Sequence, residues 1–217
     1  NPAELQLKGC NVGMLNPPYS QGSSKNPDLY ELSFTEHLLN STVEGGRIAV
    51  IVPQSSMTGK TKTEKEIKRS ILKKHTLEGV ITLNKEMFYN VGVTPCIAIF
   101  TTGVPHKINK ISKFINFEDD GYKISKHVGL VETIQARDKK QYLLDVWFDR
   151  IEAENNFCVK TTVEEDDEWL HSFYYFNEEI PLQDAFEKTM ADYLTFEFDM
   201  VLHGREYLFN SDGDTNG

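Results

Sequence analysis

The chain has few cysteines, and their placement excludes most sites built from thiols. Only three of its 217 residues are cysteine, at positions 10, 96 and 158, and none belongs to a CxxC pair. An odd number of widely spaced cysteines is typical of free thiols in a reducing compartment. The six histidines form no HxH or HxxxH pair. We therefore expect no metal site.

Long apolar segments are also missing. No apolar run approaches the roughly 20 residues that a membrane helix needs, so no membrane association is expected. The first ten residues, NPAELQLKGC, have neither the basic start nor the apolar core of a signal peptide. Together with the cysteine pattern, this predicts a cytoplasmic protein. The first residue is not Met, which suggests a processed chain or a fragment of a longer one.

Basic residues are scarce in the second half. Residues 1–104 carry a net charge of +2, whereas residues 105–217 carry −12, which gives the overall −10. Affinity for the phosphate backbone comes from Lys and Arg that displace counterions. The second half is therefore a poor nucleic-acid binder, and any contact with DNA is expected in the first half or through a partner protein.

The first 53 residues predict two buried strands with a helix between them. VGML at 12–15 is a short buried strand, ended by two prolines. Apolar residues from 29 to 39 recur at helical spacing, with Asp28 as a candidate cap and a glycine pair at 45–46 as the end. The β-branched run RIAVIVP at 47–53 is typical of a strand buried on both faces.

The next fifty residues continue the alternation. Residues 63–75 predict a helix with an Ile/Leu stripe, and Gly79 precedes a strand at 80–83. Residues 95–103 predict a further strand. Strands that alternate with helices favour an α/β layered fold with a mainly parallel sheet. The last connection has no helix, so we expect the final strand to pair antiparallel with its neighbour.

From about residue 107 the pattern changes, and we expect an α+β extension. A turn at 119–121 suggests hairpin strands, and residues 134–155 and 181–194 suggest helices. The predicted organisation is a catalytic half-domain at 1–104, an acidic extension at 105–210 that is a possible docking region for a partner, and a disordered tail at 211–217.

The stretch Asn16-Pro17-Pro18-Tyr19 directly follows the first predicted strand. Two prolines cannot continue a helix or a ladder, because they lack N–H groups and fix φ. The residue before a proline is also held in an extended conformation. The motif therefore fixes a polar amide beside an aromatic ring, at the strand end where ligands bind in open α/β sheets.

This motif, together with EGGRIAVIVPQSSM and MFYNVGVTPCIAIFTTG, resembles the N6-adenine DNA methyltransferases, and most of all the modification subunit of type I restriction–modification systems. The resemblance covers about residues 12–104. It implies transfer of a methyl group from S-adenosylmethionine to adenine N6, with DNA and the specificity and restriction subunits as partners.

The resemblance also implies roles for single residues. The Asn16 side chain and the Pro17 carbonyl would accept the two N–H groups of the adenine amino group, so that its lone pair points at the incoming methyl. Pro18 would stiffen the loop, and the Tyr19 ring would stack on a base flipped out of the duplex. A second aromatic would close the pocket: Phe88 is our choice and Tyr89 the rival. Pro53 is assigned to the same substrate pocket.

The cofactor half of such an enzyme is missing from the sequence. Only 15 residues precede Asn16, and Gly9 and Gly13 do not form a GxGxxG turn after a strand. We therefore expect a partial S-adenosylmethionine-dependent, Rossmann-like sheet that lacks its N-terminal cofactor-binding strands. Such a chain would be the C-terminal part of a longer enzyme, with an exposed sheet edge, weak cofactor binding and no activity of its own.

Two other functions remain open at this point. The same motif could act on RNA or on a protein glutamine, whose planar amide offers the same two N–H groups. Alternatively, the chain could be a non-catalytic fragment that docks a specificity or restriction subunit. The lysine-rich segment 60–74 and the acidic segment 164–168 are interpreted as solvated surface rather than nucleic-acid contacts, and Trp169 as a core or partner-contact residue.

Overall fold

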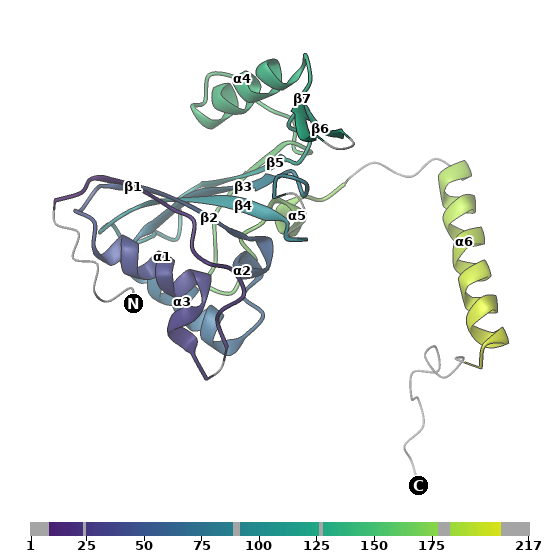
Figure 1. Ribbon diagram of the computed structural model, residues 1–217, viewed down its shortest axis with the longest axis horizontal. Helices are drawn as coiled ribbons and strands as arrows, with labels where there is room; N and C mark the ends of the chain where they lie inside the picture. The colour runs from purple at the N-terminus through teal and green to yellow at the C-terminus, as the bar shows by residue number, and fades with distance from the viewer. Residues whose placement is uncertain (1–8, 24, 89–91, 126–127, 178–182, 205–217) are drawn as a thin grey trace, which may run out of the picture. The chain divides into compact units, whose positions relative to one another are not determined.

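The computed structural model describes residues 9–23, 25–88, 92–125, 128–177 and 183–204. The chain forms two compact units, Asn1–Tyr175 and Phe176–Gly217 (Figure 1). The elements of the first unit are β1 (Val12–Leu15), η2 (Pro27–Leu29), α1 (Glu31–Asn40), β2 (Arg47–Pro53), α2 (Gln54–Thr58), α3 (Lys62–Lys74), β3 (Thr76–Leu83), β4 (Pro95–Thr101), β5 (Ser112–Phe117), β6 (Tyr122–Ser125), β7 (Gly129–Glu132), α4 (Ala136–Trp147), β8 (Cys158–Thr161) and α5 (His171–Tyr174). The second unit contains α6 (Gln183–Leu202).

A six-stranded sheet in the order β1-β2-β4-β3-β5-β8 forms the centre of the first unit. The pairs β1–β2 and β3–β5 are parallel, whereas β4 lies antiparallel between β2 and β3, and β8 is antiparallel to β5. The predicted α/β class and the antiparallel β4 are confirmed. The prediction of a mainly parallel sheet is wrong, because β4 separates the two parallel pairs.

Helices α1, α2 and α3 cover one face of this sheet (Figure 1). Leu32 and Leu39 of α1 and Ile71 of α3 are completely buried, and they belong to one core cluster with Val50 of β2 and Phe100 of β4. The apolar stripe predicted for 63–75 therefore faces the sheet. Burial of side chains of this size stabilises the unit by roughly 2 kcal/mol each.

The opposite face is covered at one end only. Val146 of α4 packs with Ile81 and Ile115, whereas Val12 and Met14 at the β1 end each remain 71% exposed. Residues 12–15 do form a strand, but the prediction that this strand is buried is wrong. The outward-facing residues of β2 are only half-buried, because the same face is open there. Among the described strands β1 pairs only with β2.

Strand β3 begins four residues earlier than predicted and contains Gly79 rather than following it. A Cβ atom on Gly79 would lie 2.2 Å from the Lys113 carbonyl oxygen of β5. The glycine is therefore required for close approach of two paired strands and does not mark a loop.

The sheet continues past residue 104, where we had predicted the end of the catalytic half-domain. The turn at 119–121 does not join two paired strands, because β5 pairs with β3 and β8, while β6 pairs with β7 in a separate two-stranded sheet. The apolar side chains of β5 enter the main core, and this burial outweighs a local hairpin. The contact-defined boundary lies at Tyr175 instead.

Several helix boundaries also differ from the predictions. Helix α1 starts at Glu31, because the proline-initiated turn η2 precedes it and Tyr30 is extended, so Asp28 does not cap it. Helix α4 ends eight residues before 155, and α6 is longer than expected. The short elements α2, α5 and β8 were not predicted. The predicted tail 211–217 lies outside the described residues.

A buried lysine joins α3 to the acidic segment 164–168. Lys68 is 1% exposed, and its Nζ donates to the carbonyl oxygens of Met57 at 2.9 Å and Asp167 at 2.5 Å. The same Nζ lies 4.7 Å from the centroid of the Trp169 ring, which is completely buried. Burial lowers the pKa of Lys68 to about 8.

Candidate functional site

The proline motif lies where two parallel strands end side by side. Strands β1 and β2 run parallel with Leu15 opposite Val50, so the residues that follow them lie at the same rim of the sheet. At this rim Asn16 is exposed and Pro17 is buried. No described residue forms a hydrogen bond to the Asn16 side chain, so the part of the chain that the structure describes leaves its amide oxygen available to a ligand.

The ring of Tyr19 is half-buried beside β2. Its hydroxyl donates to the Ile51 carbonyl oxygen at 3.4 Å. Desolvation raises the pKa of Tyr19 to about 12, with smaller contributions from Cys96 and Glu31. The phenol is therefore neutral at ordinary pH, and the residue offers the site an uncharged aromatic surface.

Phe88 lies directly beside Tyr19. The two ring centroids are 6.0 Å apart with an angle of 68° between the planes, which is an edge-to-face contact. A planar base between two parallel rings would need about 7 Å between them, from two van der Waals gaps of about 3.5 Å. The rings would thus have to turn to admit a base. Tyr89 lies outside the described residues.

Pro53 ends β2 at the same rim but is buried opposite Pro95 of β4. The next residue, Gln54, donates its backbone N–H to the Thr94 carbonyl oxygen at 2.9 Å. The structure thus brings Asn16, Tyr19 and Phe88 together with exposed or half-exposed side chains, whereas Pro53 contributes little surface.

A buried carboxylate, which the sequence analysis did not predict, lies behind this loop. Glu31 is 6% exposed, and its Oε1 accepts the backbone N–H of Ser20 at 2.6 Å. Its Oε2 accepts the hydroxyl of Ser56 at 3.4 Å. A glutamate in the first turn of a helix is ordinary because it complements the helix dipole, so neither spacing nor composition could have singled it out.

Other reactive groups at the rim are inert. The thiol of Cys96 is fully buried, donates to the Val52 carbonyl oxygen at 3.5 Å, and has its pKa raised by that burial. Within the described ranges, no group of three or more His, Cys, Asp or Glu side chains is placed to hold a metal ion. Among the same residues, no helix is long and apolar enough to cross a membrane.

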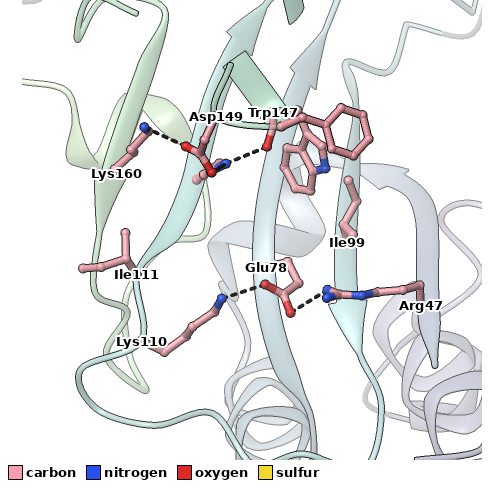
Figure 2. Close-up of a pocket in the computed structure, with 10 residues that line it drawn as sticks. Arg47, Glu78, Ile99, Lys110, Ile111, Trp147, Asp149 and Lys160 are labelled. Carbon is pink, nitrogen blue, oxygen red and sulfur yellow. Dashed lines mark hydrogen bonds and ion pairs between the residues drawn. The ribbon is translucent and has the colours of Figure 1, made fainter. Parts of the chain in front are cut away.

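A cavity of about 590 Å³ is lined by Arg47 and Glu78, near the starts of β2 and β3, whereas the motif lies where β1 and β2 end. Figure 2 shows the side chains that line it. Glu78 of β3 pairs there with Arg47 at 2.6 Å and Lys110 at 2.7 Å. Asp149 pairs with Lys113 at 2.5 Å and Lys160 at 2.8 Å, and these two lysines hold the pKa of its carboxyl at about 2. All four cations already have carboxylate partners, so the cavity is a poor phosphate site.

The basic helix α3 is similarly engaged. Arg69 pairs with Asp166 at 2.5 Å and with Glu165 at 3.7 Å, in addition to the buried bonds of Lys68. The acidic segment 164–168 therefore lies against α3, and the two neutralise each other in part. The interpretation of 60–74 as solvated surface is therefore wrong for Lys68, which is 1% exposed, whereas Lys65 of the same helix is exposed.

Comparison with known proteins gives one family and a consistent fold. Residues 7–177 match the family described as N-6 DNA methylase. The chain is 50% identical over 202 residues to the type II restriction enzyme and methyltransferase RM.BcgI of Heyndrickxia coagulans. This match covers 93% of this chain and 32% of that protein. The chain thus spans about a third of the length of this curated relative.

Solved structures share the fold at low sequence identity. The modification subunit of a type I restriction enzyme from Vibrio vulnificus superposes with a TM-score of 0.56 at 16% identity, over 79% of this chain and 38% of that one. The type I methyltransferase subunit from Streptococcus thermophilus also superposes with a TM-score of 0.56, at 17% identity, over 73% of this chain and 36% of that one. The matches extend past residue 104, in agreement with the continuous sheet.

Proposed function

The chain belongs to the N-6 DNA methylase family, and from this we propose that its full-length protein transfers a methyl group from S-adenosylmethionine to adenine N6 in DNA, as part of a restriction–modification system. The observation that carries the proposal is the exposed Asn16 amide at the end of β1, with the Tyr19 and Phe88 rings in contact at the same rim.

The described side chains suit the acceptor half of that reaction. The cofactor supplies the activated methyl group. The Asn16 amide oxygen and the Pro17 carbonyl accept the two N–H groups of the adenine amino group, which leaves its lone pair free to face the methyl. The proline-locked backbone fixes the Pro17 carbonyl and the position from which the Asn16 side chain extends, which limits the reorganisation that the site needs. Tyr19 and Phe88 stack on the base once it has left the duplex.

We place the cofactor site outside this chain. The chain spans about a third of its curated relative, and β1 has an open edge and an uncovered face among the described residues. Further strands of a complete methyltransferase sheet would extend from that edge. The three free cysteines agree with a cytoplasmic setting.

We further assign partner docking to the second unit. Helix α6 carries large apolar side chains every four residues, and all of them are at least 49% exposed: Phe186, Met190, Leu194, Phe198 and Leu202. Residues four apart are neighbours on the surface of a helix, and the row favours a helical protein surface over DNA. The specificity subunit is our choice of partner. The name of the RM.BcgI relative assigns restriction and methylation to that one protein, so a separate restriction subunit is the second choice.

The test compares methyl transfer to DNA by the full-length protein and two asparagine variants. Loss of the Asn16 acceptor in Asn16→Ala should lower kcat by about 100- to 1000-fold, as removal of one preorganised catalytic contact does. Asn109→Ala is the matched control: this asparagine is exposed and lies in the β4–β5 connection, at the other end of the parallel strands. Full activity of Asn16→Ala would refute the proposed role.

A further inference from the structure

Ser20, the residue after the proline motif, has an unusual backbone conformation. Its φ is +57°, and Asp149 is the only other non-glycine residue with positive φ in the described part of the chain. The left-handed region is unfavourable for residues with a Cβ atom, and such strain persists only where surrounding contacts enforce it. Something must therefore hold Ser20 in place.

Glu31 provides that contact. Its buried Oε1 accepts the Ser20 N–H at 2.6 Å, which is a short hydrogen bond to a carboxylate. Its Oε2 accepts the hydroxyl of Ser56, which is 2% exposed and lies in α2 directly after β2. One side chain therefore connects the exits of β1 and β2, the two strands whose ends form the candidate site.

The surroundings of Glu31 indicate a dedicated acceptor rather than half of an ion pair. Among the described residues, no lysine or arginine forms a salt bridge with it. Its two oxygens accept the two donors, and it lies in the first turn of α1. A carboxylate kept buried without a cation orients the groups that donate to it, and here these groups belong to the two strand exits.

We propose that Glu31 is a positioning residue for methyl transfer: by holding the Ser20 N–H it fixes Ser20 in the left-handed conformation, and thereby fixes the backbone of the loop that carries Asn16 and Tyr19. This inference rests on the proposed function. Glu31 touches neither base nor methyl group in this arrangement. Its effect is on the geometry of the preceding four residues.

The key experiment tests whether relief of the backbone strain at Ser20 compensates for the loss of the Glu31 side chain. In the full-length protein, Glu31→Ala should lower kcat by about 10- to 100-fold, in line with the cost of a misplaced reactive group. Glu31→Gln should keep most of the activity, because its amide oxygen still accepts the Ser20 N–H. The double variant Glu31→Ala/Ser20→Gly should recover about tenfold of the loss, because glycine adopts positive φ freely.

A purely structural role of Glu31 predicts a different pattern. Glu31→Ala would then lower thermal stability, and Ser20→Gly would not restore kcat. Glu36→Ala is the matched control on the same helix: Glu36 contacts Lys74 and Ser70 rather than the motif, so kcat should not change. If Glu31→Ala does not fold, Glu31→Asp shortens the same side chain and should show the same loss and the same glycine rescue.

Amide hydrogen exchange gives a readout that does not depend on methylation. The Ser20 amide of the full-length protein should exchange at least tenfold faster in Glu31→Ala and not in Glu36→Ala. Unchanged exchange, wild-type kcat in Glu31→Ala, or a loss that Ser20→Gly leaves untouched would each overturn the inference. Full activity of Asn16→Ala would instead refute the proposed function, while the exchange result would still decide whether Glu31 holds Ser20.

Discussion

The buried lysine of α3 allows a quantitative prediction about stability and pH. Lys68 is 1% exposed and has its pKa lowered from 10.5 to about 8, mainly by desolvation. Its Nζ has two carbonyl acceptors, those of Met57 and Asp167. A neutral amine has two N–H groups and can make both of these bonds. Loss of the proton therefore keeps both hydrogen bonds and removes the cost of a buried charge.

The sign and size of the effect follow from proton linkage. Between pH 8 and pH 10.5 the unfolded chain keeps the Lys68 proton while the folded chain has lost it. The free energy of unfolding should therefore rise with pH across this window. A shift of about 2.5 pKa units at about 1.36 kcal/mol per unit gives a total of about 3 kcal/mol. Below pH 8 both states are protonated and the contribution is constant.

The assay compares urea unfolding of wild type and Lys68→Met from pH 7 to pH 10.5. Tryptophan fluorescence reports the transition, because Trp169 is completely buried under Lys68. Methionine fills a similar volume without a titratable group, so the stability of wild type relative to Lys68→Met should increase by about 3 kcal/mol across the range. For Lys65→Met, at an exposed position of the same helix, the difference from wild type in the free energy of unfolding should be the same at every pH. If the free energies of unfolding of wild type and Lys68→Met instead change with pH in parallel, the Lys68 amine is not desolvated as described.

Two predictions concern the docking helix and the cofactor. On α6, the double variant Leu194→Glu/Phe198→Glu places charge on the apolar row and should weaken capture of the specificity subunit by at least tenfold. The control Asp192→Ala, on the opposite side of the helix, should leave capture unchanged. Equal capture by the two variants would exclude this row as the interface. In calorimetric titration, S-adenosylmethionine should bind the isolated 217-residue chain weakly or not at all, and a micromolar or tighter dissociation constant would place the cofactor site within it.

The sequence alone determined the local elements and the chemistry of the motif. The strands at 12–15 and 47–53 and the helix at 63–75 follow from β-branched runs and apolar periodicity, because these patterns act over short distances. The meeting of Asn16, Tyr19 and Phe88 at one rim was also predictable, although for Phe88 only through resemblance to a known family. A loop aromatic has no periodicity that would reveal its partner.

Only the tertiary structure decided which elements meet. The placement of β4 between two parallel pairs, the entry of β5 into the main sheet and the close approach at Gly79 depend on contacts between residues distant in the chain. The same holds for burial of charge: helical spacing places Lys68 on the face of Ile71 and Leu72, but nothing local shows which acceptors receive its amine, and nothing local distinguishes Glu31 from any acidic residue that begins a helix. Their environments arise from packing against the segment 164–169 and the exits of β1 and β2, because desolvation and hydrogen-bond geometry are properties of the assembled fold rather than of the residue.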